Sequence, residues 1–241
     1  PPFFMSIVSS SDHWMFISSN GGMTAGRKNP ENALFPYYTD DKIHDSNYTT
    51  GSKTIVLAKV NDEYVLWEPF SEKYEGVYAI QRNIYKNITG NKVVFEEVNI
   101  DLGLTFSYQW NNSDVYGFVK KSKIVNTSDK VTSVHVLDGI QNLLPFGVNM
   151  HLQQGFSTLV DAYKKNELLP EVSLGIYMLS SILTDKAEPS EALKATTVWS
   201  AGIDNKKVLL SSLQLDAFRK GAEVQQELDV RAARGAYFIV A

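Results

Sequence analysis

The densest group of charged and aromatic side chains in this sequence lies within residues 22–52. Six of these side chains suit a hydroxyl-rich ligand: Arg27, Tyr37, Tyr38, Asp40, Asp41 and His44. Tyrosine rings can stack on the apolar face of a sugar, and carboxylates accept hydrogen bonds from sugar hydroxyls. We therefore predict that these six residues bind a carbohydrate substrate.

Two combinations of aspartate and histidine suggest metal binding or general-base catalysis. Asp40, Asp41 and His44 could ligate a metal ion, but a loop gives such ligands no fixed geometry, so a solvated acidic turn is the simpler interpretation. His135 and Asp138 would point to opposite faces of a strand, out of reach for general-base catalysis. The sequence therefore predicts no metal site and no catalytic residue.

Motifs of several enzyme classes are missing. Residues 20–28 hold glycines and two basic residues, but they lack the spacing of a phosphate-binding loop, and no G-x-S-x-G elbow appears. Glu96 and Glu97 would face opposite sides of a strand and cannot form a glycosidase pair. The chain has no cysteine, which excludes disulfides and thiolate metal sites. No cofactor is predicted.

The formal net charge is −4, and the longest basic cluster covers only residues 120–123. Phosphate binding needs a basic stripe, so no nucleic-acid partner is expected. No apolar run approaches the ~18 residues of a membrane helix, and the first residues do not resemble a signal peptide. We therefore expect no membrane partner and favour a cytoplasmic location.

Alternation of apolar and polar residues indicates β-strands through the first half of the chain. Residues 102–110 show it best, because the apolar side chains share one face: Leu102, Leu104, Phe106, Tyr108 and Trp110. Turn sequences separate further predicted strands at 14–19, 54–60, 64–67, 81–87, 92–98, 115–125 and 131–137. We predict one domain over residues 1–241, mostly β, built as a large antiparallel β-sandwich with one or two helices.

Residues 134–147 would join these strands to a helix. Asp138-Gly139 is predicted to turn the chain, Pro145 to stop it, and Gln141 and Asn142 to satisfy backbone groups at the crossover. Apolar side chains at steps of three and four predict a helix over 151–168. Further strands are predicted at 174–183, 193–200, 207–215, 224–230 and from 237 onward.

Residues 22–52 show neither the period of a strand nor that of a helix, and we predict an irregular loop. Loops longer than ~12–15 residues in compact domains are usually functional or disordered. The aromatic sequence F-P-Y-Y at 35–38 argues against disorder, because such side chains need a surface to pack on. A functional loop is therefore expected.

Several stretches have a familiar order: G-V-Y-A-I-Q-R-N-I-Y-K-N-I-T-G-N-K-V-V-F-E-E at 76–97, L-G-L-T-F-S-Y-Q-W at 102–110, Y-G-F-V at 116–119, V-L-D-G-I-Q-N-L-L-P-F-G at 136–147 and E-P-S-E-A-L-K-A-T-T-V-W at 188–199. This order resembles the N-terminal β-sandwich of cellobiose-phosphorylase-like glycoside hydrolases and phosphorylases. The resemblance implies a super-sandwich of the galactose-mutarotase type. In such enzymes a helical linker and an (α/α) toroid follow, and the toroid carries the catalytic carboxylates.

The resemblance implies an accessory, non-catalytic domain that lends loops to a sugar site or to an interface. Its expected partners are a carbohydrate, a C-terminal catalytic domain outside this sequence and, as a further option, a second copy in a homodimer. The chain begins without Met and stops within apolar residues 236–241, so we expect a fragment of a longer enzyme. Two alternatives stay open: a free-standing aldose 1-epimerase, whose His and Glu we cannot map here, and a structural or dimerisation module without a ligand.

Overall fold

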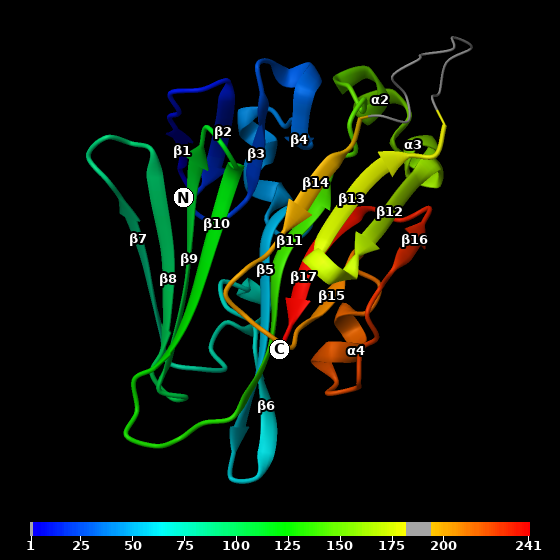
Figure 1. Ribbon diagram of the computed structural model, residues 1–241. Coiled ribbons are helices and arrows are strands. Elements are labelled where there is room, and N and C mark those ends of the chain that lie inside the picture. Colours follow the sequence, from blue (N-terminus) through cyan, green and yellow to red (C-terminus); the bar gives the residue numbers. More distant parts are fainter. Residues whose placement is uncertain (1, 182–193) are drawn as a thin grey trace.

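The computed structural model describes residues 2–181 and 194–241, and only the backbone of Asp40 and Asp41. Its strands form four antiparallel sheets, here named A to D (Figure 1). The mostly β prediction is confirmed. Residues 188–193 of the last familiar stretch lie outside the described part of the chain.

Sheets A and C are each built from four consecutive strands. Sheet A has the order β1 (Phe4–Ile7), β2 (His13–Ser18), β3 (Met23–Arg27) and β4 (Ala33–Phe35). Sheet C has the order β10 (Gly117–Asn126), β9 (Leu104–Ser113), β8 (Lys92–Asn99) and β7 (Ile80–Lys86). Short turns suffice to join antiparallel neighbours, so these two sheets follow from the local sequence.

Sheets B and D draw on distant parts of the chain. Sheet B has the order β15 (Lys207–Leu209), β17 (Gly235–Val240), β11 (Val134–Leu143), β5 (Gly51–Val60) and β6 (Glu63–Trp67). Sheet D has the order β14 (Thr196–Trp199), β13 (Leu174–Leu179), β12 (Lys164–Leu169) and β16 (Asp229–Arg231). Figure 1 shows β5, β11 and β17 running through the middle of the molecule.

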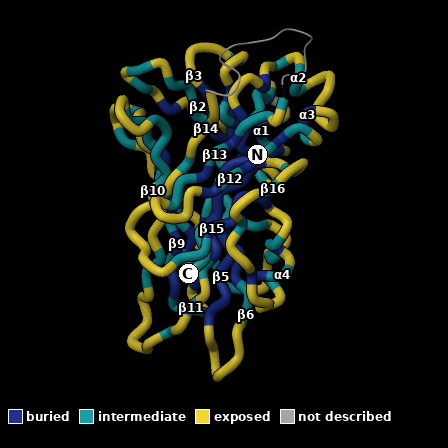
Figure 2. Tube along the Cα trace, turned by 45° about the vertical axis from the view of Figure 1, so that its right-hand side comes forward, coloured by how far each residue is buried: buried dark blue, intermediate teal, exposed yellow. Residues whose placement is uncertain are grey.

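One hydrophobic cluster takes side chains from all four sheets, including Met15 of sheet A, Trp67 of sheet B, Phe95 of sheet C and Tyr177 of sheet D. Alternation along β9 supplies four more of its members: Leu104, Phe106, Tyr108 and Trp110. The buried segments in Figure 2 accordingly lie along the central strands, and the exposed ones at the turns. The predicted inner face of β9 is confirmed.

A single pair of large sheets is not what the structure shows: four small sheets surround a shared core. The first and last strands of each described sheet have no ladder partner in the next sheet. Alternation reveals where strands lie but not which strands pair, because pairing depends on contacts between distant residues. The prediction of one sandwich was therefore too simple.

Residues 22–52 are not a structureless loop. They contain β3, β4, the 3-10 turns η1 (Pro30–Asn32) and η2 (His44–Ser46), the helix α1 (Asp40–Ile43) and the start of β5. These elements are three to five residues long up to the start of β5. Elements this short complete too few periods to appear in a hydrophobic pattern, so the loop prediction was wrong.

Asp138-Gly139 is not a turn, because β11 runs straight through it. A Cβ on Gly139 would collide with the carbonyl oxygen of Tyr237, so glycine is needed for the close approach of β17. The irregularity lies further on, where the register shifts between Gln141 and Leu143 and Asn142 has φ 59°. Gln141 Nε2 donates to the Tyr48 carbonyl at 2.9 Å, which confirms that it satisfies a backbone group.

The helix predicted at 151–168 is two shorter helices, α2 (Met150–Gly155) and α3 (Ser157–Tyr163), followed by β12. Lys164, Asn166 and Leu168 face the interior in alternation, and that period of two competes with the helical pattern. The predicted strand 207–215 contains β15 and, at its last residue, the start of a short helix, α4 (Leu215–Arg219). Only the last residues of the predicted strand 224–230 belong to a strand, β16. The prediction at 174–183 is confirmed over β13.

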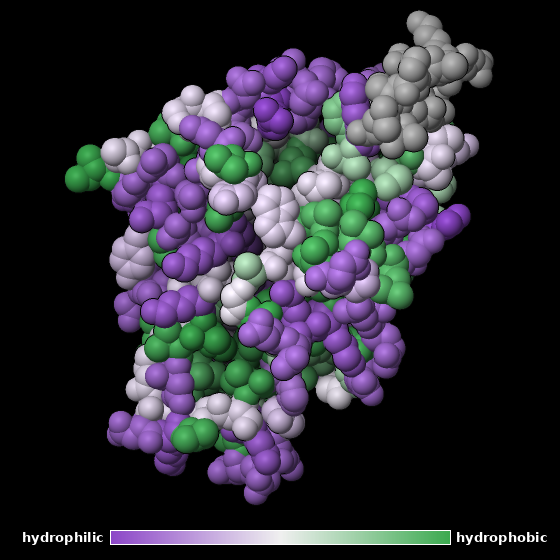
Figure 3. Space-filling model, in the orientation of Figure 1, coloured by the Kyte–Doolittle hydropathy of each residue, from purple (hydrophilic) through white to green (hydrophobic). Residues whose placement is uncertain are grey.

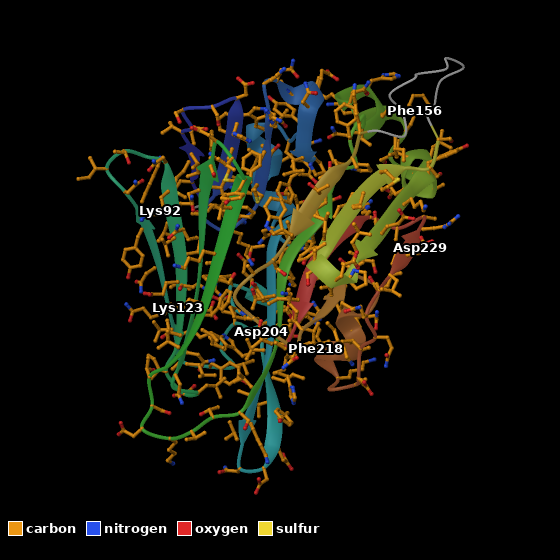
Figure 4. All side chains as sticks on the ribbon, viewed as in Figure 1. Lys92, Lys123, Phe156, Asp204, Phe218 and Asp229 are labelled. Atoms are coloured by element: carbon orange, nitrogen blue, oxygen red, sulfur yellow. The ribbon has the colours of Figure 1, made fainter. Side chains whose placement is uncertain are left out.

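Helix α4 covers the outer face of sheet B. Figure 4 shows Phe218 on this helix, and its buried ring joins a second cluster with Ile55 and Leu57 of β5. The next residues of β5, Val56 and Ala58, belong to the central core instead. Strand β5 is thus buried on both faces. Figure 3 shows hydrophilic residues over much of one surface, with apolar patches over sheet D.

Candidate functional site

The six residues predicted to bind substrate do not gather at one point. Arg27 ends β3 as an exposed residue and pairs in register with His13, whose pKa is lowered by burial and by the Arg27 charge. The His44 Nδ1 atom lies 2.5 Å from Ser18 Oγ. Because His13 and Ser18 stand at opposite ends of β2, a strand that spans roughly 17 Å between them, Arg27 and His44 lie near opposite ends of that strand.

The two predicted tyrosines have structural partners. The Tyr37 ring packs edge-on against Trp14 at 5.9 Å between centroids, and its backbone N–H donates to Gln153 Oε1 at 3.0 Å. The Tyr38 hydroxyl lies 3.2 Å from Thr50 Oγ1. The backbone of Asp40 and Asp41 forms the start of α1, and their side chains lie outside the described part of the structure.

A polar pocket lies where sheets A, B and C meet. Its inner cavity, of about 30 Å³, is lined by Asn20, Gly21, Asn47, Tyr48, Ser52, Lys53, Thr54, Pro69, Phe70, Ser71 and Tyr108. A wider hollow of about 310 Å³ shares Asn20 and Phe70 with it and adds Pro2, Ser19, Glu72 and Arg82. In Figure 1 the contributing elements are the β2–β3 turn, the start of β5, the segment after β6, and β9.

One wall of the pocket is held by a buried carboxylate. Glu97 of β8 is completely buried and accepts hydrogen bonds from Trp67 Nε1 at 2.8 Å, from the Phe70 backbone N–H at 2.6 Å and from Arg82 Nε at 2.8 Å. Arg82 also donates to the Ser71 carbonyl at 3.2 Å. The segment after β6 is thereby fixed against sheet C.

Phe70 has φ 65°, a conformation that costs a bulky residue ~1–3 kcal/mol. A hydrogen bond and ring packing hold Phe70 in this conformation. Its N–H is bound by Glu97, and its ring packs edge-on against Phe95, Phe106 and Tyr108, with centroids 6.3, 6.2 and 5.3 Å away. Strained residues of this kind concentrate at binding sites, which makes the pocket the candidate functional site.

Tyr108 lines the inner cavity with its hydroxyl, beside Gly21. Its side chain is only 3% exposed, and its ring stacks on Phe95 at 4.9 Å. Burial and the charge of Asp138 raise its pKa above the ordinary value of 10, so the phenol keeps its proton. Among the described residues, no hydrogen-bond partner is found for this hydroxyl, and its oxygen is not one of their fully enclosed unpaired polar atoms, so it reaches the open space of the cavity. It remains a donor at the cavity.

The cations of the pocket are neutralised by buried carboxylates. Lys53 pairs with Glu68, which also receives two hydrogen bonds of 3.0 Å from Arg219. Arg82 pairs with Glu97. The pocket therefore offers hydrogen bonds with little net charge. Glu72, at the rim, accepts a hydrogen bond of 3.0 Å from Tyr48, which raises the pKa of Tyr48.

No cluster of three or more His, Asp or Glu side chains with metal-binding geometry occurs among the described residues. Within the same part of the chain, no helix has the length and apolar character needed to cross a membrane.

Comparison with known proteins places the fold. The whole chain superposes on a bacterial glucoamylase solved in complex with acarbose. The TM-score is 0.55 with 8% sequence identity, and the match covers 100% of this chain and 31% of the glucoamylase. This chain thus spans less than a third of that protein's length. No family model and no curated protein matches the sequence. The shared feature is the fold of a β-domain found in a glycoside hydrolase.

Segment 22–52 does reach the pocket, but through residues other than the six predicted ones. Asn47, Tyr48 and Ser52 line the inner cavity, and Asn20 Nδ2 donates to the His44 carbonyl beside it at 2.8 Å. The remaining walls come from parts of the chain that no sequence motif connects. One signal was present: Tyr108 places a hydroxyl among the apolar side chains of β9, and a buried tyrosine hydroxyl usually serves a polar partner.

Proposed function

We propose that this chain is a non-catalytic, carbohydrate-binding β-domain of a glycoside hydrolase or phosphorylase type enzyme. The observation that carries the proposal is the superposition of the entire chain on part of a glucoamylase complexed with acarbose. The pocket adds support, since polar donors surround a cavity with little net charge. Such a lining suits a neutral polyhydroxylated ligand.

The state of the carboxylates at the pocket supports a non-catalytic role. Glycoside cleavage needs two carboxyl groups that face the scissile bond, one as acid and one as base or nucleophile. Glu68 and Glu97 are buried and committed to basic partners, and Glu72 is bonded to Tyr48. The proposed enzyme therefore takes its catalytic carboxylates from a further domain, which is the expected protein partner.

The epimerase alternative gains no support from the pocket. It requires a histidine and a glutamate facing one sugar, and no histidine lines the pocket formed by the described residues. The module without a ligand predicts a stable dimer and no sugar binding. Light scattering together with the titration below separates it from our proposal.

The test is calorimetric titration of the 241-residue chain with acarbose, maltotriose and cellotriose. We expect at least one of these ligands to bind, and Asn47→Ala to weaken its affinity about fivefold or more, the value of one neutral hydrogen bond. Asn83→Ala is the matched control, because Asn83 lies on β7 and bonds Glu96 away from the pocket. Absence of binding by all three ligands contradicts the proposal.

A second arm tests the other end of segment 22–52. The double variant Arg27→Ala, Tyr37→Ala removes two of the residues first predicted to bind substrate. If these residues form a separate contact, the double variant weakens sugar binding while Asn47→Ala leaves it intact. If the pocket is the site, the pattern reverses.

A further inference from the structure

The two parts of the pocket differ in size in a way that bears on which sugar they take. The inner cavity of about 30 Å³ has room for one or two water-sized groups, whereas the outer hollow of about 310 Å³ is at the lower end of the range for small-molecule sites. Asn20 and Phe70 border both parts. A ring fits only the larger hollow, and the 30 Å³ cavity that adjoins it at Asn20 and Phe70 takes only a small substituent.

The inner part contains the unpaired donor of the site. The Tyr108 ring is fixed by stacking on Phe95 and by the edge of Phe70, so its hydroxyl cannot swing to another partner. The turn approaches closely here, because a Cβ on Gly21 would lie 3.0 Å from that hydroxyl. The glycine keeps the space beside the hydroxyl open. The hydroxyl opens onto this space without a partner among the described residues, and a ligand oxygen that enters the space can accept its hydrogen bond.

This inference rests on the proposed carbohydrate-binding function. We propose that the pocket binds a hexopyranose unit with its ring in the outer hollow and its exocyclic hydroxymethyl group in the inner cavity, where the primary hydroxyl accepts a hydrogen bond from Tyr108. The neutralised cations Lys53 and Arg82 disfavour selection of an anionic sugar. The site then distinguishes hexoses from sugars that lack the 6-hydroxyl group.

The experiment is a thermodynamic cycle in which the Tyr108 hydroxyl of the protein and the 6-hydroxyl of the ligand are removed singly and together. Whichever of the three ligands binds in the titration above is compared with a derivative in which its 6-hydroxyl groups are replaced by hydrogen, on the wild-type chain and on Tyr108→Phe. On wild type, loss of the 6-hydroxyl should weaken binding about fivefold or more. Tyr108→Phe should weaken the affinity for the parent ligand by a similar factor and make the chain indifferent to 6-deoxygenation. Tyr85→Phe, on exposed β7, is the control and should behave as wild type.

Thermal unfolding of Tyr108→Phe shows whether the variant is folded. Should it be unstable, the wild-type comparison of parent and 6-deoxy ligand still decides. Equal affinity of both ligands on wild type overturns the hydroxymethyl assignment and leaves the carbohydrate-binding proposal standing. Binding of none of the three ligands overturns both.

Discussion

The Phe70 backbone N–H donates to the buried Glu97 carboxylate at 2.6 Å, and this bond joins the segment after β6 of sheet B to β8 of sheet C. The strained conformation of Phe70 persists because this bond and the ring packing oppose its relaxation. The shape of the pocket therefore depends on a carboxylate that is fully buried behind its wall.

Glu97→Gln should destabilise the protein by about 1–3 kcal/mol, because an amide cannot accept three donors equally well and Arg82, which is 40% exposed, loses its charged partner. Urea unfolding measures the change. Glu96→Gln is the control, since Glu96 lies on the other face of β8 and bonds Asn83 and Tyr85 near the surface. Equal stabilities of the two variants would refute the role given to Glu97.

Asn142→Ala should lower stability by about 1–3 kcal/mol and leave sugar affinity almost unchanged. Asn142 is buried, adopts φ 59° and donates through Nδ2 to Thr50 Oγ1 at 3.0 Å. Asn142→Gly keeps access to the left-handed conformation, so it should cost less backbone strain than alanine. A larger effect on affinity than on stability would assign Asn142 to the binding site.

Low pH should lower the stability of the protein, partly through protonation of Glu68. Burial raises the pKa of this carboxyl, but hydrogen bonds from Arg219 and the nearby Lys53 outweigh burial and hold the pKa below its ordinary value of 4.5. Glu68 therefore contributes stability above pH 4.5 and loses it as the pH falls through the lower folded pKa. Stability measured from neutral pH downward should fall less steeply in Glu68→Gln, whereas exposed Glu63→Gln should retain the wild-type slope.

Lys120→Met should destabilise by about 3–5 kcal/mol, because Asp138 is left in the interior without its cation. Lys120 Nζ lies 2.7 Å from Asp138 Oδ1, and both side chains are nearly buried. Adding Asp138→Leu to this variant should recover part of the loss, since an apolar pair replaces the ion pair. Chemical denaturation of the single and double variants checks this, with exposed Lys121→Met as control. Further loss in the double variant would contradict the prediction.

Sequence reasoning was most successful where one face of a strand repeats over many residues. The period of two in β9 identified its inner face, and the turn sequences located β5, β6, β8 and β10. It failed where elements are short, as within residues 22–52, and where two periods overlap, as at 151–168. Gly139 was wrongly predicted to form a turn, because glycine occurs both in turns and where two strands pack closely. Only the position of the Tyr237 carbonyl distinguishes these two roles of glycine.

The pocket could not be predicted because its walls converge only in three dimensions. Asn20, Tyr48, Phe70 and Tyr108 come from different strands or loops, at spacings set by sheet pairing. Only their residue types could be read in advance. The choice of segment 22–52 was partly useful, since its later residues do border the pocket.

The topology of sheet B also sets an order in which the protein can be made. Sheets A and C can form as soon as their consecutive strands leave the ribosome, but β11 pairs Val134 with Ala58 and Leu137 with Val240. One edge of β11 thus stays open until β17 has been synthesised and has inserted between β11 and β15. A nascent chain that pauses before residue 235 presents an unpaired, apolar strand edge, and this is the stage at which a chaperone or another unfinished chain would bind.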